Sequence, residues 1–368
     1  MTIPLYWDCF GSMSVNSGIS HYAWRLWTEF KMFDWYPRLM VDERYERIEN
    51  DLGHESLGPL RFSKLGTQKL VWPQLVGRHL MGRHPSSGQG IFHGLNNFNL
   101  PLSMTFHRHY KTVLTIHDLI PLIDSVGVSR SLSLQLKWYL PKILPVVDRI
   151  ICVSDWTLAT LLSKFPIVQG KALRIYSGVV NMKTVVENKN CKESRIKILY
   201  ISRFEKYKNF GLFKEILTKA RDEIVGDVIT DSLGEQYLLQ DKTLVQSGRL
   251  RIHRNISESA KENLLREADV YVHTSKYEGF CLPASEALSY ALPVVYLSGS
   301  GIDEVVGQCG FKNSLVDSVS TWIDTIKEAA RVRSRKECYK ICQNHLKAIG
   351  SWEKTARKVK QQYESLIE

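Results

Sequence analysis

The sequence lacks any apolar run that approaches the roughly 18 residues a membrane-spanning helix needs. Its first residues, Met1 to Asp8, have no basic region followed by an apolar stretch, so they do not resemble a signal peptide. The seven cysteines are odd in number and show no C-x-x-C spacing, which argues against a disulfide scaffold or a redox motif. We therefore expect a cytoplasmic protein with reduced thiols.

Zinc-finger spacing, a basic-region helix and an aromatic ribonucleoprotein motif are also missing, so we expect no nucleic-acid partner. The formal net charge of +11 favours anionic partners, and phosphorylated ligands or the inner face of a membrane are the remaining candidates. An excess of Lys and Arg is also common among proteins in general. The net charge alone therefore does not distinguish phosphorylated ligands from a membrane face, or either of them from no anionic partner. With 368 residues, the chain exceeds the roughly 250–300 residues at which a single core stops growing, which predicts two domains.

Apolar strands alternate with helices along both halves of the chain, which predicts an α/β protein with two Rossmann-like parallel sheets. The predicted strands are 4–10, 90–93, 112–117, 149–153 and 174–176 in the first half, and 196–202, 227–230, 250–253, 270–273 and 293–297 in the second. The predicted helices are 21–33, 155–164, 209–222, 257–268, 284–290 and 351–360. Ligands of such sheets bind beyond the carboxyl ends of the strands.

The segment 180–195 is polar and has no periodicity, so it is the best candidate for a linker. It divides the chain into a predicted N-terminal domain, 1–180, and a predicted C-terminal domain, 181–350. The capped amphipathic helix in 351–368 is expected to pack back on the first domain. Two such domains would face each other across a cleft.

Two cations, Arg203 and Lys208, follow the first strand of the second half. They would lie on a strand-to-helix loop, beside the positive end of a helix dipole, where phosphate groups bind. The Arg guanidinium can donate two parallel hydrogen bonds to phosphate oxygens, and the Lys ammonium acts as a point charge. A solvated basic turn would show the same pattern, so this motif alone leaves both interpretations open.

Two carboxylates, Glu278 and Glu286, occur where a predicted strand passes into a helix. Gly279 permits a tight turn and Pro283 suits the first helical turn. A carboxylate accepts two hydroxyl hydrogens of a sugar or ribose, which suits both residues for polyol recognition. Capping of a helix start is the alternative, and it fits Glu278 better than Glu286.

Both segments resemble the donor site of family 4 of the retaining glycosyltransferases, which have the GT-B fold. The family pattern E-G-F-G-L-P-x-x-E-A has two Glu separated by seven residues, and Glu278 and Glu286 match it in register. The family's Gly-Arg-Leu…Lys-Asn segment is similar to Ser202-Arg-Phe…Lys-Asn209. Further likeness follows the family's order over nearly the whole chain, at 115–121, 152–154, 176–179, 268–270 and 301–307.

The resemblance implies a role for each matching residue at the donor diphosphate and its sugar. Arg203 and Lys208 would hold the diphosphate and stabilise the leaving group. Glu278 would hold the donor sugar, and Glu286 the ribose hydroxyls. The backbone N–H groups that would assist Glu278 belong to the three residues Phe280, Cys281 and Leu282.

The resemblance also implies that His117 touches the donor sugar and the acceptor side of the cleft, and that Gly18 lets backbone approach the phosphate. The N-terminal domain would lie on the acceptor side and the C-terminal domain would bind the donor nucleotide. No metal or other cofactor is implied, because two cations and helix dipoles replace it. The family retains the anomeric configuration, by front-face attack in which the leaving phosphate takes the acceptor's proton.

The sequence departs from the family pattern at Cys281, where Gly is usual, and this narrows the space near the sugar. Ser202 also replaces the usual Gly before Arg203. The run His117-Asp-Leu-Ile-Pro121 resembles mannosyltransferases of surface-polysaccharide assembly, so GDP-mannose is the first donor to consider.

The acceptor is expected to be a glycan or a lipid-linked glycan. The segment 72–84 carries apolar residues with basic residues between them, as a peripheral contact with a membrane would require. A helix packed in the first domain would show the same pattern. Two other functions remain open: a nucleotide-sugar epimerase of the same fold, and a non-catalytic module that binds sugar nucleotides.

Overall fold

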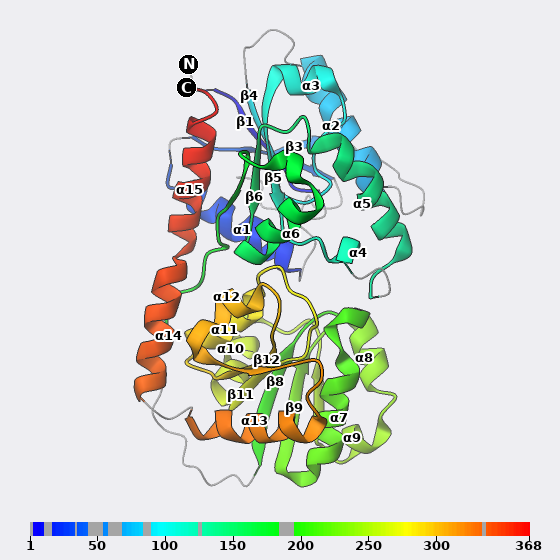
Figure 1. Ribbon diagram of the computed structural model, residues 1–368, viewed down its shortest axis with the longest axis vertical. Helices are drawn as coiled ribbons and strands as arrows, with labels where there is room; N and C mark the ends of the chain where they lie inside the picture. Colours follow the sequence, from blue (N-terminus) through cyan, green and yellow to red (C-terminus); the bar gives the residue numbers. More distant parts are fainter. Residues whose placement is uncertain are drawn as a thin grey trace. The chain divides into compact units, whose positions relative to one another are not determined.

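A computed structural model describes residues 3–10, 17–33, 35–42, 54–57, 68–83, 90–123, 127–183, 195–332 and 336–368. The chain divides into two compact units (Figure 1). The first contains Met1–Gly178 together with Trp352–Glu368, and the second contains Val179–Ser351. Most of the expected linker, 184–194, lies outside the described residues.

The first unit is built on a seven-stranded parallel sheet with the order β3-β2-β1-β4-β5-β6-β7. Its strands are β1 Leu5–Asp8, β2 Arg38–Asp42, β3 His54–Leu57, β4 Gly90–Gly94, β5 Tyr110–Ile116, β6 Arg149–Cys152 and β7 Ala172–Arg174. The strand expected at 174–176 is therefore observed two residues earlier. The helices of this unit are α1 Gly18–Phe30, α2 Gln68–Arg83, α3 Met104–His109, α4 Ile120–Ile123, α5 Arg130–Ile143, α6 Asp155–Lys164 and α15 Trp352–Glu364.

Helix α1 begins three residues earlier than expected because Ser17 caps it. The Ser17 hydroxyl accepts a hydrogen bond from the backbone N–H of Ser20 at 3.1 Å, which satisfies one of the donors left free at a helix start. The expected cap of α6 is confirmed, since the Ser154 hydroxyl accepts from the N–H of Thr157 at 3.0 Å. Of the Gly/Ser-rich loop before α1, residues 11–16 lie outside the described part.

Helix α15 packs on the first unit, although it lies at the C-terminal end of the sequence and the strands of that unit lie in the first half. Its Tyr363 is fully buried, and the Tyr363 hydroxyl lies 2.5 Å from Nδ1 of His93 on β4. At the other end, a Cβ added to Gly178 would lie 2.4 Å from the Cα of Trp352. Only glycine lets these two backbone segments approach so closely.

Three apolar residues of the segment 72–84 belong to the core of the first unit. Trp72, Val76 and Leu80 of α2 are fully buried. The interpretation of this segment as a membrane contact therefore loses its basis, because these side chains pack inward. Among the described residues, no helix is long and apolar enough to cross a membrane.

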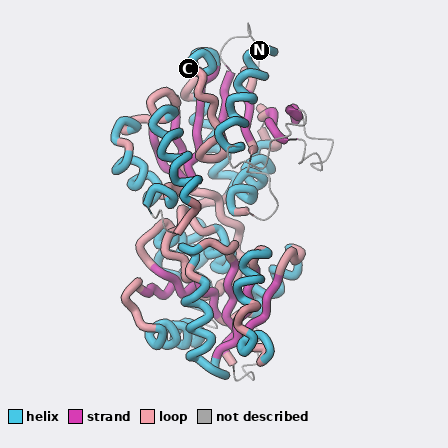
Figure 2. Tube along the Cα trace, turned by 90° about the vertical axis from the view of Figure 1, so that its right-hand side faces the viewer, coloured by secondary structure: helices cyan, strands magenta, loops and turns pink. Residues whose placement is uncertain are grey.

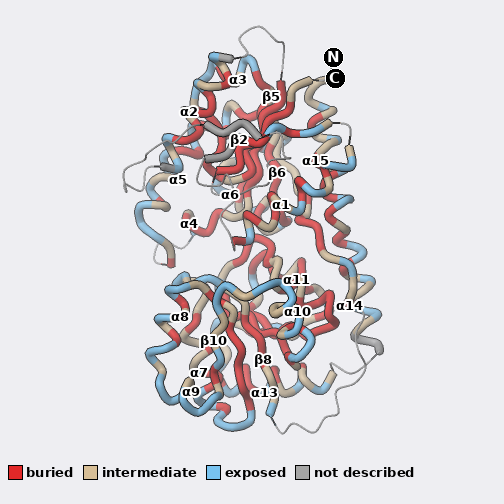
Figure 3. The backbone as a smooth tube through the Cα atoms, turned by 180° about the vertical axis from the view of Figure 1, so that it is seen from behind, coloured by how far each residue is buried: buried red, intermediate tan, exposed pale blue. Residues whose placement is uncertain are grey.

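The second unit is built on a six-stranded parallel sheet with the order β10-β9-β8-β11-β12-β13. Its strands are β8 Ile196–Ile201, β9 Ile224–Ile229, β10 Leu250–His253, β11 Val270–His273, β12 Val294–Leu297 and β13 Gly310–Asn313. The sheet strands of each unit lie between helices (Figure 2) and are mostly buried (Figure 3). The expected α/β class with two parallel sheets is confirmed.

The helices of the second unit are α7 Phe210–Ala220, α8 Ser232–Leu238, α9 Lys242–Gln246, α10 Glu258–Glu267, α11 Leu282–Ser289, α12 Ile302–Val306, α13 Val319–Val332 and α14 Lys336–Ile349. The predicted helices do not include α12 or α13, although α13 is 14 residues long. They also lack α8 and α9, which are too short to show a clear period. Each begins at a capping aspartate, Asp231 and Asp241, whose carboxylate accepts a backbone N–H of the first turn.

Candidate functional site

The candidate site lies in the second unit, at the carboxyl ends of the neighbouring strands β8 and β11. Chain connections run from β8 towards β9 and β10 on one side, and β11 to β13 lie on the other side. Parallel sheets bind ligands at such a reversal of strand order, because the loops leaving the two strands separate there. The loop after β8 carries Arg203 and Lys208, and the loop after β11 carries Glu278.

Lys208 is held in place through its backbone. Its carbonyl oxygen accepts hydrogen bonds from the Tyr200 hydroxyl at 2.7 Å and from the Thr274 hydroxyl at 3.0 Å. Tyr200 belongs to β8 and Thr274 follows β11, so both strands fix the same peptide group. Asn209, the next residue, has φ 56° and begins α7 in a left-handed conformation, which asparagine tolerates better than most residues.

Glu278 is held by the turn that follows β12. Its backbone N–H donates to the Ser300 hydroxyl at 3.1 Å, and its carbonyl oxygen accepts the N–H of Gly301 at 2.9 Å. Gly279 and Phe280 then lead into α11, with Pro283 in the first turn as expected. The carboxylate is thus placed by backbone contacts, independently of any ligand.

The side chains of Lys208 and Glu278 form a largely buried ion pair. Lys208 Nζ lies 2.5 Å from Glu278 Oε1, and the two side chains are 16% and 10% exposed. The same oxygen lies 2.5 Å from Nε2 of His273, the last residue of β11. Two hydrogen-bond donors therefore converge on one carboxylate oxygen. Within the described part of the chain, the second oxygen, Oε2, has no partner, and it is available to a hydroxyl group.

Burial and charge act in opposite directions on this carboxylate. Burial would raise the pKa of Glu278, but Lys208 and His273 outweigh it and lower the pKa to about 2. Burial likewise disfavours the charge on Lys208, yet Glu278 raises the pKa of this ammonium above its usual value. Both groups are charged at neutral pH, so the loop after β8 presents a cation that is already positioned.

Cys281 directs its thiol into the same cluster. Its Sγ lies 3.5 Å from Nε2 of His273, and the residue is buried. Its backbone has φ 73° and ψ 68°, a left-handed conformation that favours glycine. Burial, and then the charge of Glu278, raise the pKa of the Cys281 thiol well above its usual value. The Cys281 side chain therefore fills space beside Glu278 and His273, where the sequence predicted a narrower site.

Gly301 allows the turn after β12 to contact the Glu278 loop closely. A Cβ at this position would lie 2.1 Å from the carbonyl oxygen of Gly279 and 2.9 Å from that of Glu278. We expect Gly301→Ala to lower the free energy of unfolding by about 2 kcal/mol, because backbone has to move to relieve the overlap. Chemical denaturation measures this, with Gly248→Asn as a control at a left-handed position where a Cβ meets open space. Equal stability of Gly301→Ala and the native protein would contradict the close contact.

Glu286 makes its contacts with a different lysine from the one that pairs with Glu278. Lys261 of α10 places its ammonium 3.3 and 3.2 Å from the two carboxylate oxygens of Glu286, and 3.0 Å from Glu258. Burial disfavours the charge on Lys261, but the two carboxylates raise its pKa above the usual value. The structure therefore holds Glu286 on α11 by a lysine that sequence patterns did not identify.

The remaining residues that the sequence predicted for a donor site lie in the loop after β8 and at the start of α11. Arg203 is exposed and makes no ion pair with a described residue, so its guanidinium is accessible. Phe280 is buried, and Leu282 is the first residue of α11. The Leu282 N–H has no acceptor among the described residues, as is usual for the first amide of a helix. These amides begin a helix whose positive end lies beside the ion pair.

His117 and Gly18 belong to the first unit, and each is described within it. His117 follows β5, and its Nε2 lies 2.9 Å from the carbonyl oxygen of Leu95. Burial lowers the pKa of His117 to about 4, although this hydrogen bond opposes the shift, so the ring is neutral near pH 7. Gly18 begins α1, and a Cβ there would meet no atom of the described residues within 4 Å. Those residues therefore do not require glycine at this position.

The sequence interpretation missed His273 and Lys261. His273 was counted only as the last residue of an apolar strand, although its place five residues before Glu278 is a usable signal. A strand that ends at its ligand-binding edge presents its last side chain to that edge. Lys261 gave no such signal, because α10 and α11 are far apart in sequence.

Comparison with known proteins found a family match in the second half of the chain. Residues 182–340 match the model of the family described as glycosyl transferases group 1. Over 185 residues, or 46% of the chain, the sequence is 27% identical to a glycogen synthase of Anoxybacillus flavithermus. The match covers 37% of that relative, so the chain spans little more than a third of its length.

Solved structures resemble the whole chain. The sucrose-phosphate synthase of Thermosynechococcus elongatus has a TM-score of 0.79 at 15% identity, with 99% of both chains covered. Anabaena HepE, solved with UDP and glucose, has a TM-score of 0.69 at 14% identity, with 99% of this chain and 100% of that chain covered. At these identities the likeness establishes the fold, which is GT-B as expected. The family model and the fold together support a transferase.

Proposed function

We propose that this protein is a retaining glycosyltransferase that transfers a hexose from a nucleoside-diphosphate sugar to a glycan or a lipid-linked glycan. The observation that carries the proposal is the buried pair of Lys208 and Glu278, 2.5 Å apart at the reversal of strand order. A cation and a carboxylate at this edge suit the two ends of a sugar diphosphate. Arg203 lies on the same loop as Lys208 and adds a second, exposed cation.

In the proposed reaction, the bond between the sugar C1 and the diphosphate oxygen breaks while the acceptor oxygen bonds to C1. The acceptor's proton passes to the leaving phosphate oxygen. Lys208 and Arg203 stabilise the negative charge that develops on the diphosphate. Glu278 binds a sugar hydroxyl through Oε2, and Glu286 binds the ribose hydroxyls. Because two cations neutralise the leaving group, the proposed transfer needs no metal ion.

The donor is proposed as GDP-mannose, on the resemblance of the segment 117–121 to mannosyltransferases. UDP-glucose is the second donor to test, because the structure of Anabaena HepE contains UDP and glucose. Cys281 occupies space beside Glu278, which favours selection among sugars by shape as well as by nucleotide. The nucleotide and the sugar are therefore varied separately in the experiment below.

The test uses purified full-length protein with a panel of GDP-, UDP- and ADP-sugars, each with and without glycan acceptors. Calorimetry measures donor binding, and released nucleoside diphosphate measures turnover. We expect one donor class to bind and to turn over, with unchanged rates after addition of EDTA and retained anomeric configuration by NMR. An epimerised nucleotide sugar formed without acceptor would favour the epimerase, and binding without any turnover would favour the non-catalytic module. Absence of binding to every donor would overturn the proposal.

The acceptor side is assigned to the first unit, where His117 is neutral and firmly held. An anionic or lipid-linked acceptor at the inner face of a membrane is proposed, and the net charge of +11 agrees with such an acceptor without selecting it. The check is co-sedimentation with vesicles of neutral and of anionic lipid at low and high salt. Binding to anionic vesicles that salt abolishes would support a peripheral contact, and equal recovery in the supernatant would argue for a soluble glycan acceptor.

A further inference from the structure

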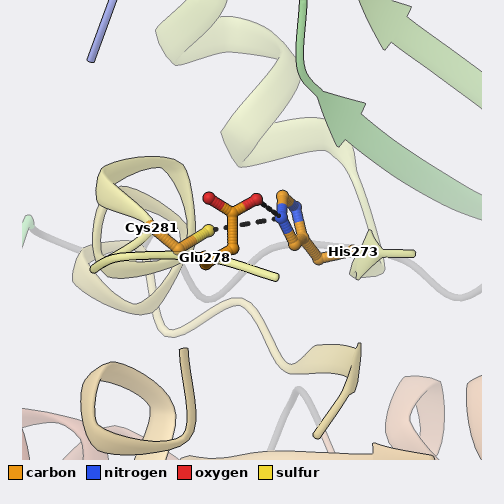
Figure 4. Close-up of side chains that lie close together, drawn as sticks. All are labelled: His273, Glu278 and Cys281. Atoms are coloured by element: carbon orange, nitrogen blue, oxygen red, sulfur yellow. Dashed lines mark hydrogen bonds and ion pairs between the residues drawn. The ribbon is translucent and has the colours of Figure 1, made fainter. Parts of the chain in front are cut away.

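Three side chains of different chemistry meet beside Lys208: His273, Glu278 and Cys281 (Figure 4). All three are buried, and one ligand atom of each lies within 4.8 Å of the others. Nε2 of His273 faces both partners, since it lies 2.5 Å from Glu278 Oε1 and 3.5 Å from Cys281 Sγ. An imidazole nitrogen, a thiol and a carboxylate are the ligand types that zinc takes in proteins.

The second ring nitrogen of His273, Nδ1, also has a hydrogen-bond partner. Nδ1 lies 3.1 Å from the hydroxyl of Tyr271, which lies 3.4 Å from the carbonyl oxygen of Ile201. A hydroxyl can accept from Nδ1–H while it donates to that carbonyl. With the proton on Nδ1, the lone pair of Nε2 faces Glu278 and Cys281 and can bind a metal ion. In the ion pair described above, Nε2 carries a proton and donates it to Glu278, so metal binding has to displace that proton. Metal-binding histidines are oriented by such a hydrogen bond to the second ring nitrogen.

Cys281 reaches the cluster at an energetic cost. Its left-handed backbone, with φ 73°, disfavours any residue that has a Cβ. Strained conformations of this kind are energetically unfavourable and concentrate at functional sites. The thiol at this position is therefore a second observation that the donor site alone does not explain.

We propose that His273, Glu278 and Cys281 form a binding site for Zn²⁺, and that zinc inhibits the enzyme by taking Glu278 from Lys208. Zinc bonds of about 2.0–2.3 Å hold tetrahedral ligand atoms about 3.3–3.6 Å apart. The separation of 3.5 Å between His273 and Cys281 already fits this geometry. Glu278 has to withdraw from His273 by about 1 Å, and the thiol releases its proton to solvent on binding.

Lys208 and zinc compete for the same carboxylate. The Lys208 ammonium lies 2.5 Å from Glu278 Oε1, so a divalent cation between Glu278 and His273 would be repelled by it. Lys208 has a flexible side chain that is 16% exposed and can swing away. The ion pair and the metal site are therefore alternatives. The inhibition rests on the proposed function, because it requires that Glu278 and Lys208 serve the donor, whereas zinc binding does not.

Binding is measured without donor or turnover, on the purified full-length protein after treatment with chelator. Zn²⁺ is titrated against a chromogenic chelator, and Co²⁺ is added as a spectroscopic substitute. We expect one ion per chain and a thiolate-to-cobalt charge-transfer band. A spectrum without that band would overturn the proposal, whatever the behaviour of the variants.

The variants are expected to act in opposite directions. Cys281→Ser weakens zinc binding by about 10–100-fold, and Cys309→Ser, at another buried free cysteine of the same unit, leaves it unchanged. Cys281→Gly fits the left-handed backbone better than the native residue, so it serves if the serine variant fails to fold. Lys208→Met tightens zinc binding about tenfold, because it removes the competing charge. Unchanged binding in both Cys281 variants, or weaker binding in Lys208→Met, would overturn the site or the competition.

The inhibition is tested separately, once a donor has been found. We expect Zn²⁺ to lower the transfer rate, chelator to restore it, and Cys281→Gly to resist the effect. Bound zinc with full transfer activity would refute the inhibitory role. Failure to find any donor would instead count against the proposed function, and the binding results would stand.

Discussion

Replacing Lys208 by alanine is expected to lower kcat/KM for the donor by about 10²–10³-fold, the loss seen when one donor to a developing anion is removed. The side chain is the buried cation of the site, 2.5 Å from Glu278. The matched control is Lys206→Ala, because Lys206 lies on the same short turn, carries the same charge and is exposed. Initial rates of nucleotide release, with donor varied, separate kcat from KM.

The loss of Lys208 also leaves the Glu278 carboxylate buried without its cation. Breaking a buried ion pair from one side costs about 3–5 kcal/mol, whereas removing both charges is nearly neutral. The double variant Lys208→Met with Glu278→Gln therefore separates the two effects: we expect stability to recover while activity stays lost. Activity that recovers together with stability would mean that Lys208 acts only on folding.

Acidification is expected to weaken the second unit through Glu278, and Glu278→Gln is expected to remove this sensitivity. The folded-state pKa of about 2 lies below the ordinary value of 4.5, so the unfolded chain binds the proton more readily. The stability that Glu278 contributes is fully present above pH 4.5 and is lost as the pH falls towards 2. This contribution is about 3 kcal/mol, because a difference of one between the folded and unfolded pKa of a group corresponds to about 1.36 kcal/mol.

The measurement compares urea unfolding of the native protein and of Glu278→Gln at several pH values between 7 and 3. The difference in unfolding free energy between the two should shrink as the pH falls. Glu353→Gln provides the control, because Glu353 is an exposed carboxylate paired with Arg357 on α15. If Glu278→Gln and Glu353→Gln gave the same pH dependence, Glu278 would not be charged in the folded protein.

Local sequence signals predicted the elements that surround the site. The strands 250–253 and 270–273 agree with β10 and β11. The first alternates apolar and polar residues, and the second is an apolar run that ends at His273. The cap at Ser154 and the proline in the first turn of α11 act over three or four residues, so they can be recognised without knowledge of the fold. Short helices such as α8 and α9 were missed because one or two turns give no period to detect.

Helix α2 is a case in which local sequence signals could not predict the environment of a helix. Its apolar residues with interspersed basic residues fit a membrane surface or a core equally well. The structure decides for the core, with Trp72 and Val76 fully buried. An apolar helix face has the same sequence pattern whether protein or lipid covers it. Only the elements packed against α2 could therefore distinguish a core helix from a membrane contact.

By itself, the sequence predicted an α/β chain with two parallel sheets, which the structure confirms, and it singled out Arg203, Lys208, Glu278 and Glu286 as candidate donor-site residues. Only the tertiary structure decided that Lys208 and Glu278, 70 residues apart, are bonded to each other and to His273, and that Lys261 holds Glu286. The physical reason is that residue type and spacing encode hydrogen-bonding capacity and local conformation. The pairing of β8 with β11 depends on which strands bury each other, and that is settled over the whole sheet.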